Sequence, residues 1–261
     1  MSVPDFGHMP AGYNLLYRET LDSTNEEALR LGQAGEEGPL WVVARRQTAG
    51  RGRRGRAWTS PEGNLMTSLL LSLSVTPIVA AQLSFVAGLA VYDMIVELSR
   101  GKKNVGLKWP NDVLLADKKI AGILLEASGT ANKRMRLIIG IGINLVHYPK
   151  DTPYPAASVA AFTGEIHSIS QVLPLLAHKF SVRFQEWIYG EGFETTRLAW
   201  LERAAGVGEK IEVRLPSTIH KGIFAGLDEQ GALMLAQGRG RVCSIPAGDV
   251  FFPTPLKRDA L

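Results

Sequence analysis

Strand-like segments follow one another between residues 105 and 145 without a helix to separate them. They are Val105–Trp109, Val113–Leu115, Ile120–Ala127 and Arg136–Leu145, with Ala116-Asp117-Lys118-Lys119 as a hairpin turn. Strands in consecutive runs, with helices on either side, are typical of an α+β fold. We therefore expect a mixed or antiparallel central sheet flanked by helices, and no regular βαβ alternation.

Further elements are expected on both sides of this run. Before it lie strand patterns at Tyr13–Arg18, Leu40–Arg46 and Leu65–Val75, a helix at Glu26–Gln33 with Thr24 and Glu27 as a capping box, and an apolar helix from Pro77 to Leu98. After it come amphipathic helices at Val172–Tyr189 and Phe193–Ala204. The most apolar stretch, Leu83–Leu98, contains Asp93 and is too short to span a bilayer.

The pattern changes after Ala205. Short alternating strands at Lys210–Leu215, Ile219–Gly226 and Ala232–Ala236 are separated by glycines and turn residues. This spacing is typical of a small, SH3-like β-barrel. We expect two domains, a catalytic domain at residues 1–205 and the β-barrel domain at residues 206–261.

Arginines and glycines alternate in the segment Gly50-Arg51-Gly52-Arg53-Arg54-Gly55-Arg56-Ala57-Trp58, here named the Arg/Gly loop. Glycine lets a ligand approach the backbone, and arginine offers a charged planar fork to a carboxylate or phosphate. The loop matches G-x-G-x-x-G, but Pro61 prevents the long helix that must follow a dinucleotide site. Ala57 replaces the hydroxyl residue of a Walker A motif, and no HRD motif accompanies Asp5-Phe6-Gly7, which excludes a kinase.

Composition restricts the partners of this loop. The formal net charge is +4, and removing the six arginines at positions 45, 46, 51, 53, 54 and 56 leaves 4 − 6 = −2. The positive charge is therefore local, whereas a general nucleic-acid binder has a wider basic surface. The single cysteine, Cys243, and five scattered histidines provide no disulfide framework or metal cluster. A cytoplasmic enzyme without a signal peptide is the expectation.

Four further segments of the sequence offer polar groups or space that could bind a ligand. Lys108-Trp109-Pro110-Asn111-Asp112 ends an apolar strand and offers a cation, an amide and a carboxylate for phosphates, a sugar or Mg²⁺. Lys119 precedes an apolar strand, and Gly140-Ile141-Gly142-Ile143-Asn144 leaves side-chain gaps for a ligand. Each segment also has a purely structural interpretation: a strand-end turn, a surface lysine and tight sheet packing. Asp22-Ser23-Thr24-Asn25 is either a helix cap or a site for a neutral headgroup such as a ureido ring.

The candidate residues are cationic and hydrogen-bonding, and the sequence shows no Ser-His-Asp or Cys-His nucleophile. Such residues suit the neutralisation of two anions better than covalent catalysis. A carboxylate that attacks the α-phosphate of ATP has this requirement, because both reactants are negatively charged.

Taken together, these motifs resemble those of the biotin–protein ligases. The resemblance rests on the segments 22–25, 47–58, 108–112, 119–126 and 140–145, in that order, and on the β-rich region after Ala205. It implies a two-step reaction in which biotin and MgATP give biotinyl-5′-AMP and pyrophosphate, and a lysine of a biotin carboxyl carrier protein then attacks the adenylate. The nucleophile would come from the partner.

The resemblance also implies roles for single residues. Biotin and its adenylate are expected at Ser23, Thr24, Asn25, Gln47, Arg51, Gly52, Arg53 and Lys119, and ATP at Arg54, Arg56, Trp58, Lys108, Asn111, Asp112 and Asn144. Arg53, Lys108 and Lys119 are the expected catalytic residues. Mg²⁺ would bind mainly through ATP phosphates, with Asp112 as an outer-shell partner.

Two other functions are kept for comparison. A lipoate–protein ligase shares the general fold and adenylation chemistry, and an RNA-binding module could carry the Arg/Gly loop. Because few residues precede Ser23, no N-terminal DNA-binding domain of the kind seen in some ligases is expected. A monomer and a homodimer are both compatible with the sequence. The Arg/Gly loop should be mobile in the free protein and become ordered around its ligands.

Overall fold

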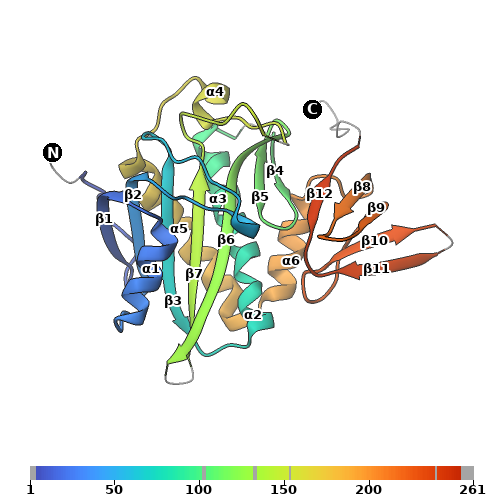
Figure 1. Ribbon diagram of the computed structural model, residues 1–261, viewed down its shortest axis with the longest axis horizontal. Helices are drawn as coiled ribbons and strands as arrows, with labels where there is room; N and C mark the ends of the chain where they lie inside the picture. The colour runs from blue at the N-terminus through green and yellow to red at the C-terminus, as the bar shows by residue number, and fades with distance from the viewer. Residues whose placement is uncertain (1–3, 102–103, 132–133, 153, 239, 254–261) are drawn as a thin grey trace.

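The computed structural model describes residues 4–101, 104–131, 134–152, 154–238 and 240–253. Two sheets stand side by side in this structure, a seven-stranded sheet with helices on both faces and a five-stranded sheet near the C-terminus (Figure 1). The strand order of the larger sheet is β1-β2-β3-β7-β6-β5-β4. Its strands are β1 (Asn14–Leu21), β2 (Leu40–Gln47), β3 (Leu65–Leu73), β4 (Val105–Lys108), β5 (Asp112–Leu115), β6 (Lys118–Ala131) and β7 (Arg134–Ile143).

The pairing of these strands confirms the predicted mixed sheet. β1 and β2 are parallel, and every other pair in the larger sheet is antiparallel. β5 and β6 are joined by the predicted hairpin turn, in which Ala116 and Asp117 both have positive φ angles. β4, β5, β6 and β7 therefore form one continuous antiparallel run, as their consecutive order in the sequence indicated.

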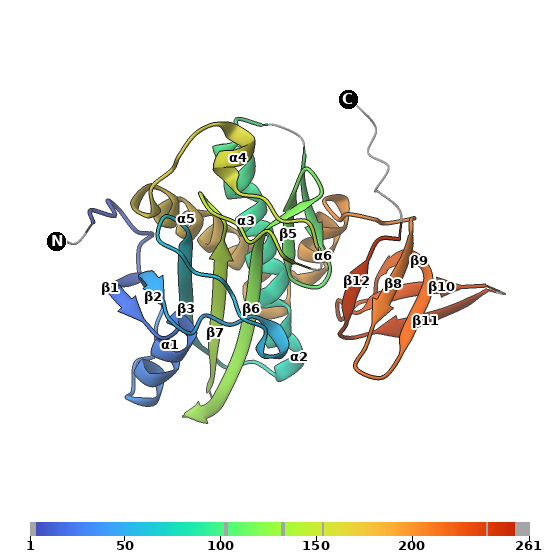
Figure 2. The same ribbon diagram turned by 45° about the horizontal axis from the view of Figure 1, so that its top comes forward.

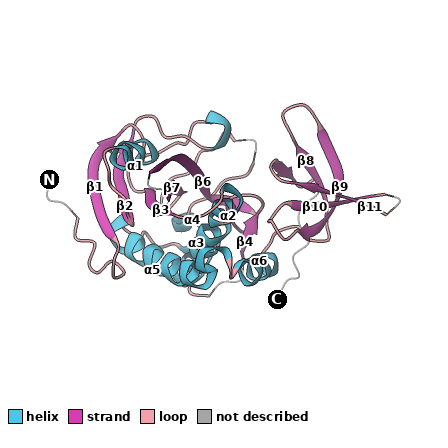
Figure 3. Ribbon diagram, turned by 90° about the horizontal axis from the view of Figure 1, so that it is seen from below, coloured by secondary structure: helices cyan, strands magenta, loops and turns pink. Residues whose placement is uncertain are grey.

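Helices cover the two faces of the larger sheet unequally. α1 (Thr24–Gln33) packs on one face against Val42, Leu70 and Ile138, whereas α3 (Leu83–Leu98) and α5 (Ile169–Trp187) cover the other (Figures 1 and 3). The remaining helices are α2 (Pro77–Ala81), α4 (Val159–Thr163) and α6 (Phe193–Glu202), with 3₁₀ turns η1 (Arg53–Gly55) and η2 (Ile188–Gly190). Adjacent β2 residues face opposite sides, since Trp41 and Val43 join the α3/α5 core.

The apolar character of α2 and α3 follows from this position. The segment Pro77–Leu98 is long and apolar enough to cross a membrane, but 67% of its most apolar window is buried inside the protein. Phe85 on α3 packs edge-on against Phe193 and Trp200 of α6, at ring-centroid distances of 5.6 and 5.5 Å. These contacts make α3 the central helix of the core, and α6 attaches the second sheet to it.

The second sheet is antiparallel, with the order β11-β10-β9-β8-β12. Its strands are β8 (Lys210–Arg214), β9 (Ile219–Leu227), β10 (Leu233–Gln237), β11 (Arg241–Ile245) and β12 (Asp249–Phe251). The pairings among described residues do not join β11 to β12, so the predicted small SH3-like unit is an open, curved sheet (Figure 2). Ala205 donates to the Leu107 carbonyl at 2.7 Å, so the chain leaving α6 pairs with β4 before entering this sheet.

Local differences from the sequence prediction have simple causes. The predicted helix from Pro77 to Leu98 is divided at Gln82 into α2 and α3. The strand β12 and the short helix α4 were not predicted, because three and five residues give little pattern to recognise. The strand β11 was also missed, although β8 and β10, which have the same length of five residues, were predicted. The capping box at Thr24 and Glu27 is wrong, since Ser23 is the N-cap and Thr24 is already helical.

Candidate functional site

A cavity of about 580 Å³ lies where the Arg/Gly loop crosses the larger sheet and meets β12. All the predicted site residues belong to the described part of the chain, and all except Arg54 line this cavity. They come from the start of α1, the end of β2, the Arg/Gly loop, the β4–β5 hairpin, the start of β6 and the residue after β7. Segments that are more than a hundred residues apart in the sequence therefore contribute to one site.

One end of the cavity is a network of neutral hydrogen-bonding groups. The Thr24 backbone N–H donates to Gln47 Oε1 at 2.7 Å, and the Thr24 hydroxyl donates to the same oxygen at 3.1 Å. Ser68 Oγ on β3 lies 2.7 Å from Thr24 Oγ1 and 2.5 Å from Asn25 Oδ1. Ser23, Thr24 and Asn25 are each 5% exposed or less. Here the Asp22–Asn25 segment is both a helix start and a polar pocket wall.

The glycines of β7 provide space for this arrangement. A Cβ atom on Gly140 would lie 2.1 Å from Asn25 Oδ1, and one on Gly142 would lie 2.5 Å from the Trp58 indole. In this structure Asn25 and Trp58 fill the gaps that were predicted to admit a ligand. The gaps therefore bring an amide and an aromatic ring against the sheet and so shape the cavity wall.

The opposite end of the cavity is cationic. Arg53 Nη1 donates to Asn111 Oδ1 at 3.0 Å, and its Nη2 donates to the Gly248 carbonyl at 3.1 Å. Burial lowers the pKa of Arg53, while the nearby Asp249 carboxylate acts in the opposite direction. Arg54 and Arg56 also pair with Asp249, Arg54 at 3.0 Å. One carboxylate of the second sheet, Asp249 on β12, thus pairs with three arginines of the Arg/Gly loop.

Lys108 is held in an aromatic pocket at this end. It is 5% exposed, and its Nζ lies 3.5 Å from the centroid of the Tyr154 ring. Tyr154 stacks on Phe251 of β12 at 4.6 Å. Burial lowers the pKa of Lys108 to about 8, and the charges of Lys119 and Arg56 act in the same direction. Lys108 therefore keeps its charge near neutral pH and loses it in mildly alkaline solution.

Lys119 lies between the two ends. Its Nζ pairs with Asp112 Oδ1 at 2.6 Å and lies 5.6 Å from the Trp58 ring. No group of three or more His, Cys, Asp or Glu residues suited to a metal ion exists among the described residues. Asp112, already paired with Lys119, would make at most one ligand, which suits a Mg²⁺ ion carried by phosphates better than a protein-only site.

Family comparisons agree with this geometry. Residues 17–144, which contain nearly all of the larger sheet, match the Biotin/lipoate A/B protein ligase family. The Biotin protein ligase C terminal domain matches residues 206–252, which contain the second sheet. The chain therefore belongs to the biotin protein ligase family and is a ligase.

Individual relatives extend over most of the chain. A biotin–[acetyl-CoA-carboxylase] ligase of Paracoccus denitrificans is 45% identical over 236 residues, covering 88% of this chain and 97% of the relative. A bifunctional ligase/repressor of Bacillus subtilis is 33% identical, covering 88% of this chain and 71% of the relative. The solved biotin protein ligase of Aquifex aeolicus in complex with biotin and ATP has a TM-score of 0.79 and 30% identity, covering 94% and 99% of the two chains.

Several cavity residues were missed by the sequence analysis. Asp249, Phe251 and Arg214 come from the second sheet, Tyr154 comes from the segment after β7, and Glu126 contacts the cavity residues Asn25 and Arg51. Glu126 ends the segment 119–126 that carries the family resemblance, so its position was visible although its contacts were not. Asp249 and Phe251 stand in a short strand with no recognisable motif, and only the three-dimensional structure places them at the site.

Proposed function

We propose that this protein attaches biotin to a lysine of a biotin carboxyl carrier protein through biotinyl-5′-AMP. One observation carries the proposal: a single cavity joins a buried neutral hydrogen-bonding pocket to a cluster of cations. Biotin has the matching form, with a neutral ureido ring at one end and a carboxylate at the other. In the first step a carboxylate oxygen bonds to the α-phosphorus of ATP, and pyrophosphate leaves.

The residues divide according to the two ends of the cavity. Ser23, Thr24, Asn25 and Gln47 would bind the ureido ring, with Arg51 and Gly52 along its side. Arg53 would hold the carboxylate and the α-phosphate, because its guanidinium is already directed into the cavity by Asn111 and the Gly248 carbonyl. Lys119 would neutralise the biotin carboxylate, and its ion pair with Asp112 would then be weakened.

ATP is assigned to the cationic end. Lys108 and Arg56 would face its phosphates, Trp58 and Asn144 its nucleoside, and Asn111 and Asp112 its ribose and phosphates. Arg54 does not line the cavity itself but pairs with Asp249, which does, so it would act by holding the loop. Mg²⁺ would be held mainly by the phosphates of ATP, with Asp112 as an outer-shell partner, and would neutralise charge on the pyrophosphate.

In the second step the neutral amine of the carrier lysine bonds to the acyl carbon of the adenylate, AMP leaves, and the amine loses a proton. A nucleophile supplied by the partner agrees with a cavity lined by cations and amides. We propose that residues 1–205 form the catalytic domain and residues 206–261 a domain that completes the ATP end through β12. We also propose that the enzyme acts in the cytoplasm as a monomer or homodimer, without DNA or membrane partners.

Biotin-dependent exchange between ATP and labelled pyrophosphate tests the first step directly. We expect exchange with biotin and none with lipoate, because the neutral pocket offers paired donors and acceptors that a lipoyl ring cannot use. Transfer of labelled biotin to a purified carrier domain tests the second step. Exchange with lipoate alone would overturn the substrate, and exchange without transfer would overturn the carrier assignment.

A further inference from the structure

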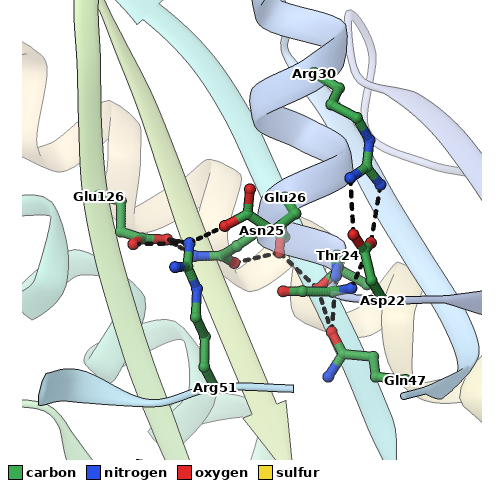
Figure 4. Close-up of polar contacts among 10 residues, drawn as sticks. Asp22, Thr24, Asn25, Glu26, Arg30, Gln47, Arg51 and Glu126 are labelled. Atoms are coloured by element: carbon green, nitrogen blue, oxygen red, sulfur yellow. Dashed lines mark hydrogen bonds and ion pairs between the residues drawn. The ribbon is translucent and has the colours of Figure 1, made fainter. Parts of the chain in front are cut away.

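Glu126 lies in the middle of β6, beside the cavity, and the proposed reaction gives it no role. Its side chain is 33% exposed, and its carboxylate contacts two residues that belong to different parts of the site (Figure 4). Glu126 Oε2 accepts a hydrogen bond from Asn25 Nδ2 at 2.7 Å and one from Arg51 Nη2 at 3.2 Å. One carboxylate thus joins the neutral pocket to the beginning of the Arg/Gly loop.

The contact with Asn25 fixes the orientation of a buried amide. The two ends of an asparagine side chain have nearly the same shape, so only its partners decide which end is the donor. A carboxylate accepts and does not donate, so Glu126 selects the NH₂ group, while Ser68 Oγ lies beside Oδ1. A ureido ring presents both N–H donors and a C=O acceptor, and it could turn either of them toward the amide. An amide of fixed orientation is compatible with only one of these two placements of the ring.

The contact with Arg51 fixes the start of the loop. Arg51 Nη2 lies between two carboxylates, Glu126 at 3.2 Å and Glu26 of α1 (Figure 4). Arg53 follows two residues later and projects into the cavity. Without the Glu126 carboxylate, Arg51 keeps Glu26 as a partner on the far side but loses its tie to the sheet. The position of Arg53 would then be less restricted.

We propose that Glu126 is a positioning residue that links recognition of the biotin ureido ring to placement of the Arg/Gly loop. It acts through Asn25 on biotin affinity and through Arg51 on the rate of adenylation. This proposal rests on the proposed function, since it assigns Asn25 to biotin and Arg53 to the reacting groups. It predicts that the two effects can be separated by the choice of substitution.

Glu126→Gln and Glu126→Ala separate them. The glutamine keeps an oxygen that accepts from Asn25 but has no charge for Arg51, whereas alanine removes both contacts. In the pyrophosphate-exchange assay we expect both variants to lower kcat about threefold, the size of a partly exposed ion pair. Only Glu126→Ala should raise the KM for biotin, by about tenfold, because it also frees a buried amide. The KM for ATP should stay within about twofold of wild type.

Glu62→Gln is the matched control. It also removes a carboxylate from an arginine pair, with Arg45, but Glu62 is 61% exposed and lies outside the cavity lining. It should leave kcat and both KM values unchanged. If Glu126 only stabilised the fold, its substitution would lower the fraction of protein that is active. This loss would lower the apparent kcat and leave both KM values unchanged. It would be equal in any variant of similar melting temperature.

The outcomes distinguish the two proposals. A wild-type protein without biotin-dependent exchange would overturn the proposed function itself. Active wild type, with glutamine and alanine variants that share one biotin KM, would overturn the role of Glu126 and leave the function standing. As a second readout, amide hydrogen exchange over residues 50–58 with bound biotin should be faster in Glu126→Gln than in wild type. Equal protection in the two proteins would also contradict the link to the loop.

Discussion

The two ends of the cavity are built in different ways. At the neutral end, Thr24, Asn25 and Ser68 are almost fully buried and already hydrogen-bonded to one another across α1 and the sheet. At the cationic end, Arg54 and Arg56 are 37% and 52% exposed and pair with Asp249 of the second sheet. One end belongs to a single packed core, and the other depends on two sheets meeting.

This difference indicates how each end treats its substrate. The side chains of the neutral pocket are buried and hydrogen-bonded to one another without a ligand, so we expect the pocket to select a ligand by matching its donors and acceptors. At the cationic end, carboxylates of the protein pair with the cations, and the phosphates of the proposed ATP would replace or join these carboxylates. Changes at the neutral end should therefore appear mainly in the KM for biotin. Changes at the cationic end should appear in the rate of adenylation and its dependence on ATP.

Arg53→Ala should have the largest effect. Arg53 is the loop arginine held by both Asn111 and the second sheet, and it would meet charge that develops on the reacting groups. Loss of one such preorganised donor lowers the rate about 100-fold, measurable as kcat in pyrophosphate exchange. Arg54→Ala is the matched control, because Arg54 does not line the cavity, and it should reduce the rate only about twofold. Equal losses in both variants would mean that the loop acts through its net charge.

Lys108 should give the cationic end a pH dependence. Its pKa is lowered to about 8 by burial, so the ammonium is present below pH 8 and is lost above it. Asp112 and Asp249 favour the charged form, whereas Lys119 and Arg56 oppose it. We expect kcat/KM for ATP to fall about tenfold per pH unit above 8, since that ratio reports the free enzyme.

Lys108→Arg checks this assignment, because guanidinium stays charged throughout the range. The variant should lose the alkaline decline between pH 8 and 9.5, whatever its absolute rate at pH 7. The KM for biotin should show no matching change in either protein. An unaltered decline in the arginine variant would assign the titration to another group.

Gly140→Ala should damage the neutral end selectively. The new Cβ would lie 2.1 Å from Asn25 Oδ1, so the amide must move away from Ser68. Losing the alignment of one buried amide should raise the KM for biotin about tenfold and leave the KM for ATP unchanged. Gly238→Ala is a suitable control, since nothing lies within 4 Å of its Cβ position. A rise in both KM values would show that the two ends are not independent.

Much of the fold could be predicted from the sequence, for reasons visible in its elements. β3 is buried at every position and β6 follows β5 through a two-residue turn, so both have strong local patterns. The second sheet was recognised by its turn residues. β12 has only three residues, and a pattern that short cannot be distinguished from an extended loop.

The site could be predicted as far as its motifs extend. All fifteen predicted site residues belong to the described part of the chain, and fourteen of them line one cavity. The exception is Arg54. The carboxylates around the arginines were not foreseen, because Glu26, Glu126 and Asp249 meet the Arg/Gly loop only after the chain has folded. Long-range charge pairing has no sequence period, whereas strands and helices do.

The smallest effect is expected from Asp249→Asn, which tests whether these carboxylates hold the loop. The sequence predicted a loop that is mobile until ligands neutralise it, but Asp249 pairs with Arg53, Arg54 and Arg56. The variant should exchange amide hydrogens over residues 50–58 faster than wild type without ligands. Bound biotin and ATP should restore the protection of these amides. The rate of ATP–pyrophosphate exchange with saturating substrates should change by about twofold or less. The neutral end should keep its biotin KM, because its hydrogen bonds involve no residue of the second sheet. Equal hydrogen exchange in the two free proteins would mean that packing against the cavity, and not Asp249, orders the loop.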